Sequence, residues 1–220
     1  MTPLSSAQVK AYLRVLGVTR AEPSLEALHR LVRAHLMGIP FENISRLYRC
    51  RVLGLRDVPD LDLFLAGEQH HLGGTCYANN FHFYRLLDAL GYDAALCGAD
   101  MPSGEDVHAA ILVSIDGGEF LVDAGYATPR PIEHFLAVVR GSFDEKATSM
   151  NSVMLVRFLG ATSVTVHNLT LLHPTAAGST VEPLADRQEL AAAIERHFEV
   201  PAAIVNEAIG DRAVLRGVYA

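Results

Sequence analysis

The spacing of apolar residues changes at Gly91, and this change most constrains what the chain can fold into. Before Gly91, apolar residues recur every three or four positions, a period that is typical of amphipathic helices. After Gly91, short runs of β-branched and aliphatic residues are separated by glycine-containing turns, which indicates antiparallel strands. A block of helices followed by strands, without βαβ alternation, predicts an α+β fold and argues against a dinucleotide-binding fold.

Serine or proline at the start of an apolar stripe and glycine at its end mark the helices of the N-terminal part. We expect helices after Ser5-Ser6 up to Gly17, from Pro23-Ser24 to Gly38, over Asp60–Leu65 and over Cys76–Leu90. The expected strands are Val107–Ile115, Glu119–Val122, Val153–Leu159 and Ser163–Leu172, and a last helix starts at Asp186 and runs through Phe198.

Composition limits the classes of partner. The 220 residues carry 18 Lys and Arg against 25 Asp and Glu, a formal net charge of −7. Such a chain lacks the broad positive field that nucleic-acid binding requires, so we expect no nucleic-acid partner. Residues Met1–Ser6 lack the charged and apolar regions of a signal peptide, and no apolar run is long enough to span a membrane. We therefore expect a cytoplasmic protein without a membrane partner.

The three cysteines, Cys50, Cys76 and Cys97, lack the even count and the spacing of a disulfide framework. Cys76 follows Gly73-Gly74-Thr75 and opens a predicted helix, whose N-terminus carries partial positive charge and unpaired N–H groups. These features favour the thiolate form, so Cys76 is the candidate nucleophile. The alternative is a small buried apolar residue, as most free cysteines are. We expect Cys50 and Cys97 to be structural or incidental.

A thiolate nucleophile needs a base, and the base needs an acceptor that orients it. His108 interrupts an apolar strand, and Asp123 ends the strand predicted to pair with it. A hairpin turning at Asp116-Gly117-Gly118 would bring the two side chains opposite each other across the ladder. Taken alone, His108 could be a satisfied core histidine and Asp123 a turn former. Together with Cys76 they supply a nucleophile, a base and an orienting group for acyl transfer or hydrolysis.

Several short motifs, in this order, resemble the arylamine N-acetyltransferase family, of which this chain looks like a divergent, shortened member. They are Ile39-Pro-Phe-Glu-Asn-Ile44, Gly73-Gly-Thr-Cys-Tyr77 with Asn80, His108, and Val122-Asp-Ala-Gly-Tyr126. The resemblance implies a cysteine-protease-like core in three parts. These are an N-terminal helical bundle with the nucleophile over residues 1–91, a central antiparallel β-barrel-like domain with the histidine and aspartate over 92–172, and a reduced C-terminal α/β lid over 173–220.

The resemblance also implies an enzyme that moves an acetyl group by a ping-pong mechanism from acetyl-CoA to an amine acceptor such as an arylamine, without a tightly bound cofactor. Cys76 would match the acyl-carrying cysteine of the family, His108 the base and Asp123 the orienting carboxylate. The expected substrate-binding residues are Phe41, Gly74, Thr75, Tyr77 and Tyr126, of which Phe41 and Tyr126 match aromatic positions of the acceptor pocket. Backbone N–H groups around Cys76 and Tyr77 are expected to hold the oxyanion.

Three departures from the family pattern bear on the substrates. Leu72 stands where the family usually has an arginine, so the expected ion-pair partner of Glu42 is absent, and Ala78 replaces a common glutamate. The stretch between Asp123 and Val153 is much shorter than in typical members, which removes strands and a loop that shape the donor and acceptor sites. The donor therefore stays open between acetyl-CoA and another acyl thioester. The alternative activity is an amide synthase acting on an acyl or polyketide chain bound to an acyl carrier protein.

Other interpretations use the same residues. Zinc ligands could be His70, His71, Cys76 and His82, but their spacing matches no structural zinc motif. The simpler expectation is a solvated pair at 70–71, a helix-surface His82 and no metal site. The triad could instead serve a cysteine peptidase or a transglutaminase-like acyltransferase. The chain could also be a non-catalytic relative that keeps the three residues as part of its fold.

Overall fold

The computed structural model describes residues 3–101, 104–123, 128–131, 143, 148–159, 162–175 and 178–210. The helices are α1 (Ser6–Val15), α2 (Leu25–Gly38), α3 (Ile44–Val52), α4 (Leu61–Ala66), the 3₁₀ turn η1 (Gly67–His70), α5 (Cys76–Leu90), α7 (Thr148–Asn151), α8 (Arg187–Phe198) and α9 (Ala202–Ile209). The strands are β1 (Phe41–Glu42), β2 (Asp93–Met101), β3 (Gly104–Ile115), β4 (Gly118–Val122), β5 (Thr128–Pro131), β6 (Met154–Leu159), β7 (Thr162–His167), β8 (Thr170–Thr175) and β9 (Gly178–Pro183).

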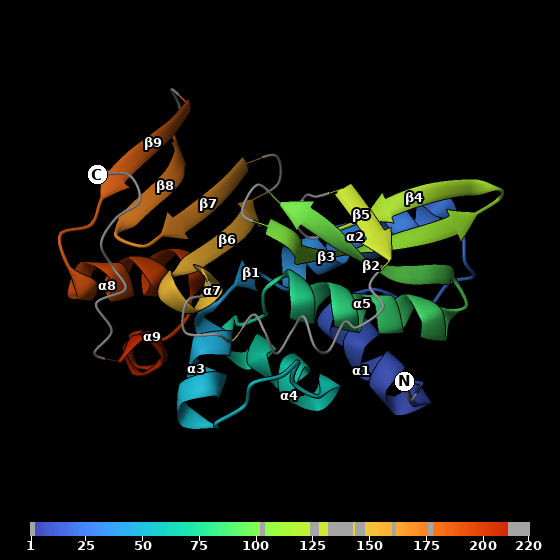
Figure 1. Ribbon diagram of the computed structural model, residues 1–220, viewed down its shortest axis with the longest axis horizontal. Helices are drawn as coiled ribbons and strands as arrows, with labels where there is room; N and C mark the ends of the chain where they lie inside the picture. The colour runs from blue at the N-terminus through green and yellow to red at the C-terminus, as the bar shows by residue number, and fades with distance from the viewer. Residues whose placement is uncertain are drawn as a thin grey trace.

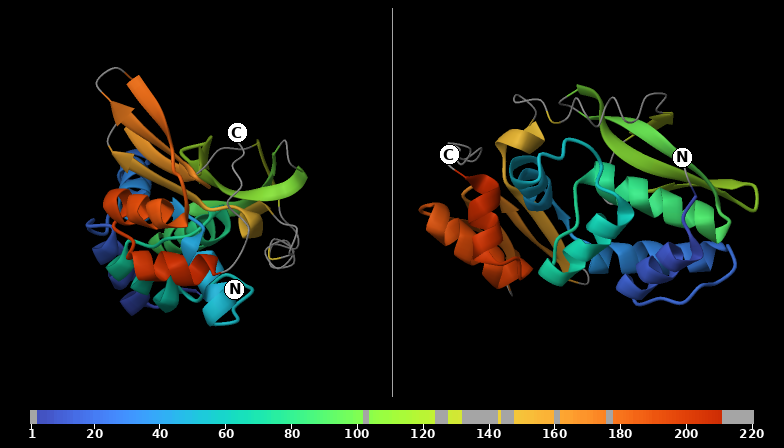
Figure 2. Two further views of the ribbon diagram at one scale, coloured as in Figure 1. Left: turned by 90° about the vertical axis from the view of Figure 1, so that its left-hand side faces the viewer. Right: turned by 90° about the horizontal axis from the view of Figure 1, so that it is seen from below.

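The strands form two antiparallel sheets that lie above most of the helices in Figure 1. One sheet has the order β4-β3-β2-β5 and the other the order β1-β6-β7-β8-β9. Seen from below in Figure 2, the helices lie in front of the sheets. Among the described residues both sheets are open, with an edge strand on each side. The α+β class is therefore confirmed, whereas the β-barrel-like shape that the resemblance implied is not formed by these strands.

The predicted N-terminal helices are confirmed. Residues at their starts cap free backbone N–H groups, and a glycine ends α5. The Ser5 hydroxyl accepts the Gln8 N–H at 3.3 Å in a capping box at the start of α1. The Asp60 carboxylate accepts the Leu63 N–H at 2.8 Å at the start of α4. Gly91 ends α5 with a φ of 97°, a left-handed conformation that favours glycine.

Helices α3, α7 and α9 and the 3₁₀ turn η1 are additional to the predicted ones. Helix α3 turns Arg46 and Arg49 into the protein, so its buried face is not a continuous apolar stripe. The apolar residues Ile44, Leu47 and Tyr48 nevertheless follow a helical period, so this helix could have been predicted from the sequence. Helices α3 and α9 pack against each other, which brings the C-terminal part of the chain next to the segment after Glu42.

The strand predictions hold for the first hairpin and fail for part of the second sheet. Asp116 and Gly117 turn between β3 and β4 with φ values of 51° and 79°, as a two-residue hairpin turn requires. The single strand predicted over Ser163–Leu172 is wrong, because the chain turns within it and forms β7 and β8. Asn168 takes a φ of 52° at that turn, a conformation that asparagine tolerates better than most residues. Strands β1, β2, β5 and β9 are additional to the predictions. The division of the chain into parts at residues 91 and 172 stays a prediction.

Helix α5 joins two hydrophobic cores. Its first residues, Cys76 and Tyr77, belong to the core beneath the five-stranded sheet. Later residues of the same helix, among them Phe83 and Leu86, belong to the core shared by α1, α2, α4 and the four-stranded sheet. The position of Cys76 is thus fixed by packing on both sides of the molecule.

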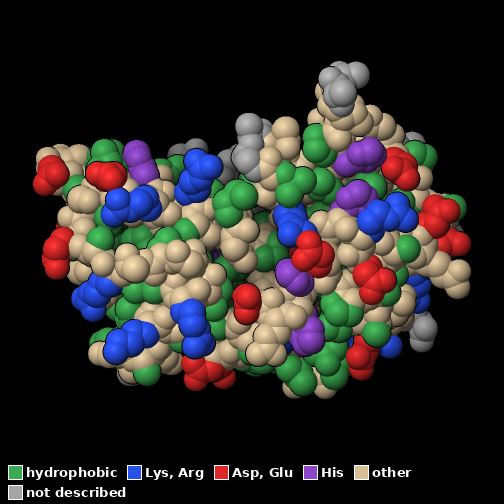
Figure 3. Space-filling model, turned by 180° about the vertical axis from the view of Figure 1, so that it is seen from behind, with side chains coloured by type: hydrophobic (Ala, Val, Ile, Leu, Met, Phe, Trp, Pro, Cys, Tyr) green, Lys and Arg blue, Asp and Glu red, His purple; other side chains and the backbone are tan. Residues whose placement is uncertain are grey.

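The surface shows charges of both signs. On the face seen in Figure 3, basic and acidic side chains are interspersed among the described residues. The described helices include none that combines the length and the apolar composition needed to cross a lipid bilayer.

Two histidines are buried near the core that α1, α2, α4 and the four-stranded sheet share. His82 is 0% exposed, which corrects the expectation of a helix-surface residue: its ring stacks on Phe64 with centroids 4.5 Å apart, and its Nε2 lies 3.0 Å from the Pro59 carbonyl oxygen. His35 lies near Phe83, with ring centroids 4.6 Å apart. Burial lowers the pKa of each imidazole from 6.5 to about 3, so both rings are neutral in the folded protein at neutral pH.

These histidines predict loss of stability in mild acid. The folded protein keeps them neutral while the unfolded chain protonates them below about pH 6.5. The free energy of unfolding should therefore fall with pH from 6.5 towards 3, by up to about 1.4 kcal/mol per pH unit for each ring. Urea unfolding at several pH values measures this slope. His82→Phe should reduce it and exposed His29→Gln should not; equal slopes in all three proteins would contradict the prediction.

Candidate active site

The loop before Cys76 is held by close backbone packing. A Cβ atom on Gly73 would lie 2.3 Å from the Pro40 carbonyl oxygen, and one on Gly74 would lie 2.8 Å from the Ala78 Cβ. Both positions therefore need glycine. Phe41 and Gly74 form an isolated parallel bridge, in which the Glu42 N–H donates to the Gly74 carbonyl at 3.1 Å. Cys76 begins α5 immediately after this loop and is 5% exposed.

The carboxylate of Glu42 holds the same loop from beneath. It is 0% exposed and accepts the Gly73 N–H at 3.0 Å and the Ser45 N–H at 2.8 Å. The Ser45 hydroxyl in turn donates to the Gly73 carbonyl at 3.2 Å. A buried carboxylate is expensive unless its charge is compensated. The backbone donors and the nearby buried Arg49 provide this compensation.

Arg49 interacts electrostatically with Glu42. Burial lowers the pKa of its guanidinium, and the negative charges of Glu42 and Asp60 oppose that effect. Leu72 stands where the family usually has an arginine that would pair with Glu42. The Leu72 side chain is buried in the core. The positive charge near Glu42 thus comes from α3, a helix that is not among those expected from the sequence.

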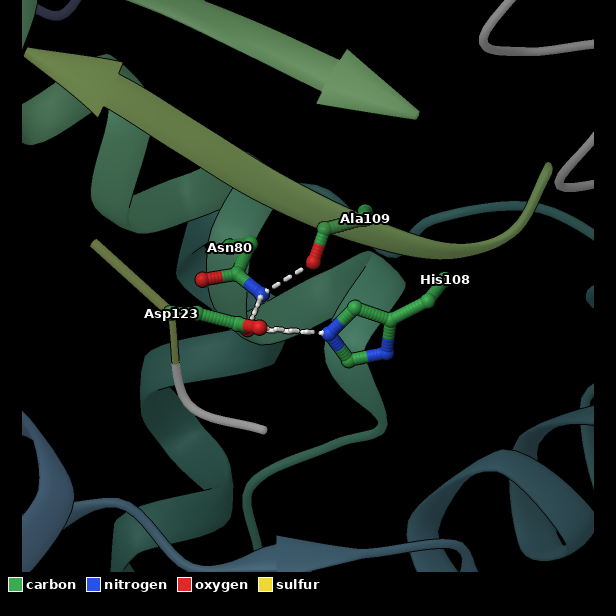
Figure 4. A network of polar contacts seen from close by, with 4 residues as sticks. All are labelled: Asn80, His108, Ala109 and Asp123. Carbon is green, nitrogen blue, oxygen red and sulfur yellow. Dashed lines mark hydrogen bonds and ion pairs between the residues drawn. The ribbon is translucent and has the colours of Figure 1, made fainter. Parts of the chain in front are cut away.

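His108 and Asp123 are joined as expected. The Nε2 atom of His108 lies 2.9 Å from Oδ1 and 2.8 Å from Oδ2 of Asp123, and both side chains are buried. Asn80, one turn after Cys76 on α5, donates through Nδ2 to Asp123 Oδ1 at 2.9 Å and to the Ala109 carbonyl at 2.6 Å (Figure 4). Asn80 therefore ties the helix of the nucleophile to the strands of the other two residues.

The register of the hairpin differs from the expected one. Ile111 pairs with Val122, so Ala110 and not His108 lies opposite Asp123. The turn is centred between Asp116 and Gly117, which is later than direct pairing of His108 with Asp123 would require. His108 is two residues from the paired position, so its side chain stays on the same face of the sheet and reaches Asp123 diagonally.

Asp123 and Cys76 both favour the charged form of His108. Burial by itself would lower the pKa of His108, but its hydrogen bonds to Asp123 and to Cys76, together with their charges, raise that pKa from 6.5 to about 10. The imidazole is thus cationic at neutral pH. Asn80, Asp123 and His108 thus form one polar chain, and α5, which carries Asn80, begins at Cys76.

A small pocket lies at the start of α5. Its volume is about 20 Å³, enough for roughly one water molecule, and its lining includes Gly74, Thr75 and Tyr77, whose role in substrate binding stays a prediction. Its other lining residues are Ser45, Arg46, Arg49, Asp57, Val58, Pro59, Ala78 and Phe143. Phe41 is not among the lining residues and packs against the core under the five-stranded sheet. Tyr126 lies outside the described residues.

Sequence reasoning missed the two pocket arginines, Arg46 and Arg49, because charged residues on a helix are normally assigned to its solvent face. Their only signal is their placement in the turns that follow Glu42.

The zinc interpretation gains no support from the side chains that it requires. His71 is exposed and lies 3.3 Å from Glu199, while the Nε2 of His82 faces the Pro59 carbonyl. Within the part of the chain that the structure describes, no group of three or more His, Cys, Asp or Glu side chains could hold a metal ion.

Comparison with known proteins identifies relatives of the chain. A family model described as N-acetyltransferase matches residues 24–139, just over half of the chain. Proansamycin X synthase of Amycolatopsis mediterranei (strain S699) is 33% identical over 132 residues, or 57% of this chain and 50% of that protein. An arylamine N-acetyltransferase of Mycolicibacterium smegmatis is 34% identical over 129 residues, or 52% of this chain and 45% of that protein. The chain thus spans about half the length of these curated relatives.

Solved structures share the fold at low sequence identity. The arylamine N-acetyltransferase from Mycobacterium abscessus matches with a TM-score of 0.73 at 15% identity, covering 96% of this chain and 100% of that one. The Mycobacterium marinum arylamine N-acetyltransferase in complex with CoA matches with a TM-score of 0.69 at 19% identity, covering 94% and 96%. These likenesses support the fold of the whole described chain.

Asn80 offers a test of the polar chain. Asn80→Ala removes both hydrogen bonds of the amide, so we expect a loss of about 1–3 kcal/mol in the free energy of unfolding. The pKa of His108 should also fall, because Asp123 is no longer fixed. Urea unfolding and NMR titration of the His108 ring measure the two effects.

Asn79→Ala is the matched control. This neighbouring buried amide donates to the Pro40 carbonyl at 3.3 Å rather than to Asp123. It should destabilise the fold and leave the His108 titration in place. The same titration shift in both variants would rule out a specific role for Asn80.

Proposed function

Because the chain belongs to the N-acetyltransferase family, we propose that it is an acyltransferase that carries an acyl group on Cys76 from a thioester donor to an amine. The observation that supports this most directly is His108, whose Nε2 lies 2.8 Å from Oδ2 of Asp123 and whose pKa is raised by both Asp123 and Cys76. Such an arrangement supplies the activated nucleophile, the proton carrier and the group that orients it.

In the first half-reaction, the Cys76 thiolate attacks the carbonyl carbon of the thioester. A bond forms between Sγ and this carbon, and the negative charge moves to the carbonyl oxygen, where N–H groups at the start of α5 stabilise it. The bond to the donor sulfur then breaks, and the departing thiolate takes the proton of the His108 imidazolium. The products are acyl-Cys76, neutral His108 and the free donor thiol.

In the second half-reaction, an amine attacks the acyl-Cys76 carbonyl. His108 accepts a proton from the amine nitrogen as the C–N bond forms. The C–S bond breaks and Cys76 departs as a thiolate beside the regenerated imidazolium. One amide and one thiol are formed for each thioester and amine consumed, and Asp123 keeps the ring in place throughout.

Acetyl-CoA or another acyl-CoA is the donor we favour, because a solved relative with the same fold is a complex with CoA. A second candidate is an amide synthase that takes its acyl chain from a carrier protein. Similarity to proansamycin X synthase, at 33% identity over 132 residues, favours this alternative. Both candidates use the same acyl-Cys76 intermediate and differ in what carries the acyl group.

We assign the role of a lid to the C-terminal segment over residues 173–220. Glu199 at the end of α8 lies 3.3 Å from His71, in the loop before the nucleophile, and 2.9 Å from Arg157 on β6. The contact with His71 connects the segment to the loop before Cys76, which supports a role at the rim of the site.

Mass spectrometry tests the proposed activity. Mixing the protein with acyl-CoA and acyl-pantetheine donors should add one acyl mass, located on Cys76 by peptide mapping and removed by an amine acceptor. Cys76→Ala should abolish the adduct, and His108→Gln should slow its formation about 10²- to 10⁴-fold.

Cys97→Ala, which alters a thiol buried in β2, is the control and should keep the adduct. An adduct that persists in Cys76→Ala would contradict the acyl-cysteine mechanism. A Cys76 that resists both acylation and alkylation at neutral pH would identify a non-catalytic relative.

A further inference from the structure

A groove apart from the nucleophile lies between α1 and α4, two helices that pack against each other below the sheets (Figure 1). Its volume is about 450 Å³, which falls in the range of about 300–1,000 Å³ that is typical of small-molecule sites. The two helices contribute faces with the same spacing, and these faces consist of Ala11, Arg14 and Val15 on α1 and of Asp62, Leu65 and Ala66 on α4.

The groove carries charges of both signs that do not pair with each other. Arg14 lies on α1, while Asp62 lies on α4 and Glu68 on η1. Within the described part of the chain, none of these three side chains takes part in an ion pair or a hydrogen bond. By contrast, Arg30 pairs at 2.8 Å with an exposed glutamate one turn away on α2. The carboxylates of the groove therefore lie beyond direct contact with Arg14.

Apolar side chains line the same groove. Val15 and Leu65 are half-buried and pack against the core beneath them. A ligand that covers their outer atoms removes apolar surface from water, which favours binding. Gln69 of η1 adds an amide that can both donate and accept hydrogen bonds.

The charges of the groove determine which ligand fits it. A guanidinium presents a planar fork of N–H donors that matches a carboxylate, so Arg14 suits the anionic end of a ligand. Asp62 and Glu68 accept hydrogen bonds from an ammonium group. A ligand with only negative charge meets two carboxylates, and a ligand with only positive charge meets the guanidinium. The groove therefore favours a ligand that carries both charges.

We propose that the groove between α1 and α4 binds a small zwitterion with an apolar body, such as an apolar amino acid or a short apolar peptide. The carboxylate of the ligand contacts Arg14, its ammonium contacts Asp62 and Glu68, and its apolar part covers Val15 and Leu65. The groove shares no lining residue with the pocket at the start of α5. The proposal is therefore independent of the proposed acyl transfer at Cys76.

NMR titration of isotope-labelled protein with leucine and related compounds tests the site. Leucine should cause saturable shifts of the backbone amide signals over residues 11–15 and 62–69. Leucinamide lacks the carboxylate and 4-methylpentanoate lacks the ammonium, so each should bind at least about tenfold more weakly than leucine. Leucyl-leucine has its two charges farther apart. Tighter binding of the dipeptide would support a peptide as the ligand, and tighter binding of leucine would support a free amino acid.

Variants of the charged residues test the two ends of the ligand separately. Arg14→Gln should weaken leucine binding about tenfold and leave leucinamide binding unchanged, because leucinamide has no carboxylate to lose. Asp62→Asn combined with Glu68→Gln should weaken the binding of leucine and leucinamide and spare that of 4-methylpentanoate. Arg30→Gln removes an exposed arginine of α2 and is the matched control, which should bind leucine as the wild type does. Thermal unfolding of each variant shows whether it is folded.

Several results would overturn the proposal. One is the absence of saturable shifts with both leucine and leucyl-leucine at millimolar concentrations. Equal binding of leucine, leucinamide and 4-methylpentanoate, or unchanged leucine binding in folded Arg14→Gln, would show that the charges of the groove do not recognise the ligand. Shifts at the start of α5 in place of the groove would assign the zwitterion to the site of Cys76 and would also overturn the proposal.

Discussion

The buried carboxylate of Glu42 is the interaction on which the rest of the site depends. By accepting N–H groups from Gly73 and Ser45, it fixes the loop that ends at Cys76 against the segment that leads into α3. The loop has no room for a side chain at Gly73, so hydrogen bonding and steric contact impose the same conformation. With the loop fixed, the start of α5, and with it the thiol, has one position relative to both sheets.

Helix α5 transmits this constraint to the other polar residues. Asn80 bonds to Asp123 and to the strand of His108, so the thiol, the imidazole and the carboxylate share one rigid support. The same helix packs into both hydrophobic cores, and the free energy gained there can offset the cost of burying charged groups. The polar chain is therefore stabilised mainly by the apolar packing around it and less by its own ion pairs.

Local chemistry made much of this architecture predictable. Caps such as Ser5 and Gly91, the turn at Asp116 and the thiol at a helix start depend on neighbours within a few residues, so their effects can be deduced from the sequence. Other features depend on distant contacts. Arg46 is buried because aromatic rings from elsewhere in the chain cover it, and the break between β7 and β8 depends on a backbone conformation that Asn168 allows without requiring it. The pairing register of the β3–β4 hairpin likewise could not be deduced from neighbouring residues alone.

That register has a consequence for how chains of this kind can vary. His108 and Asp123 meet because His108 lies two positions, an even offset, from the residue opposite Asp123. The loop at the tip could change in length or composition without disturbing the pair. One residue gained or lost within either strand, by contrast, would point one of the two side chains to the opposite face. Evolutionary drift in the length of this hairpin should therefore be confined to its tip.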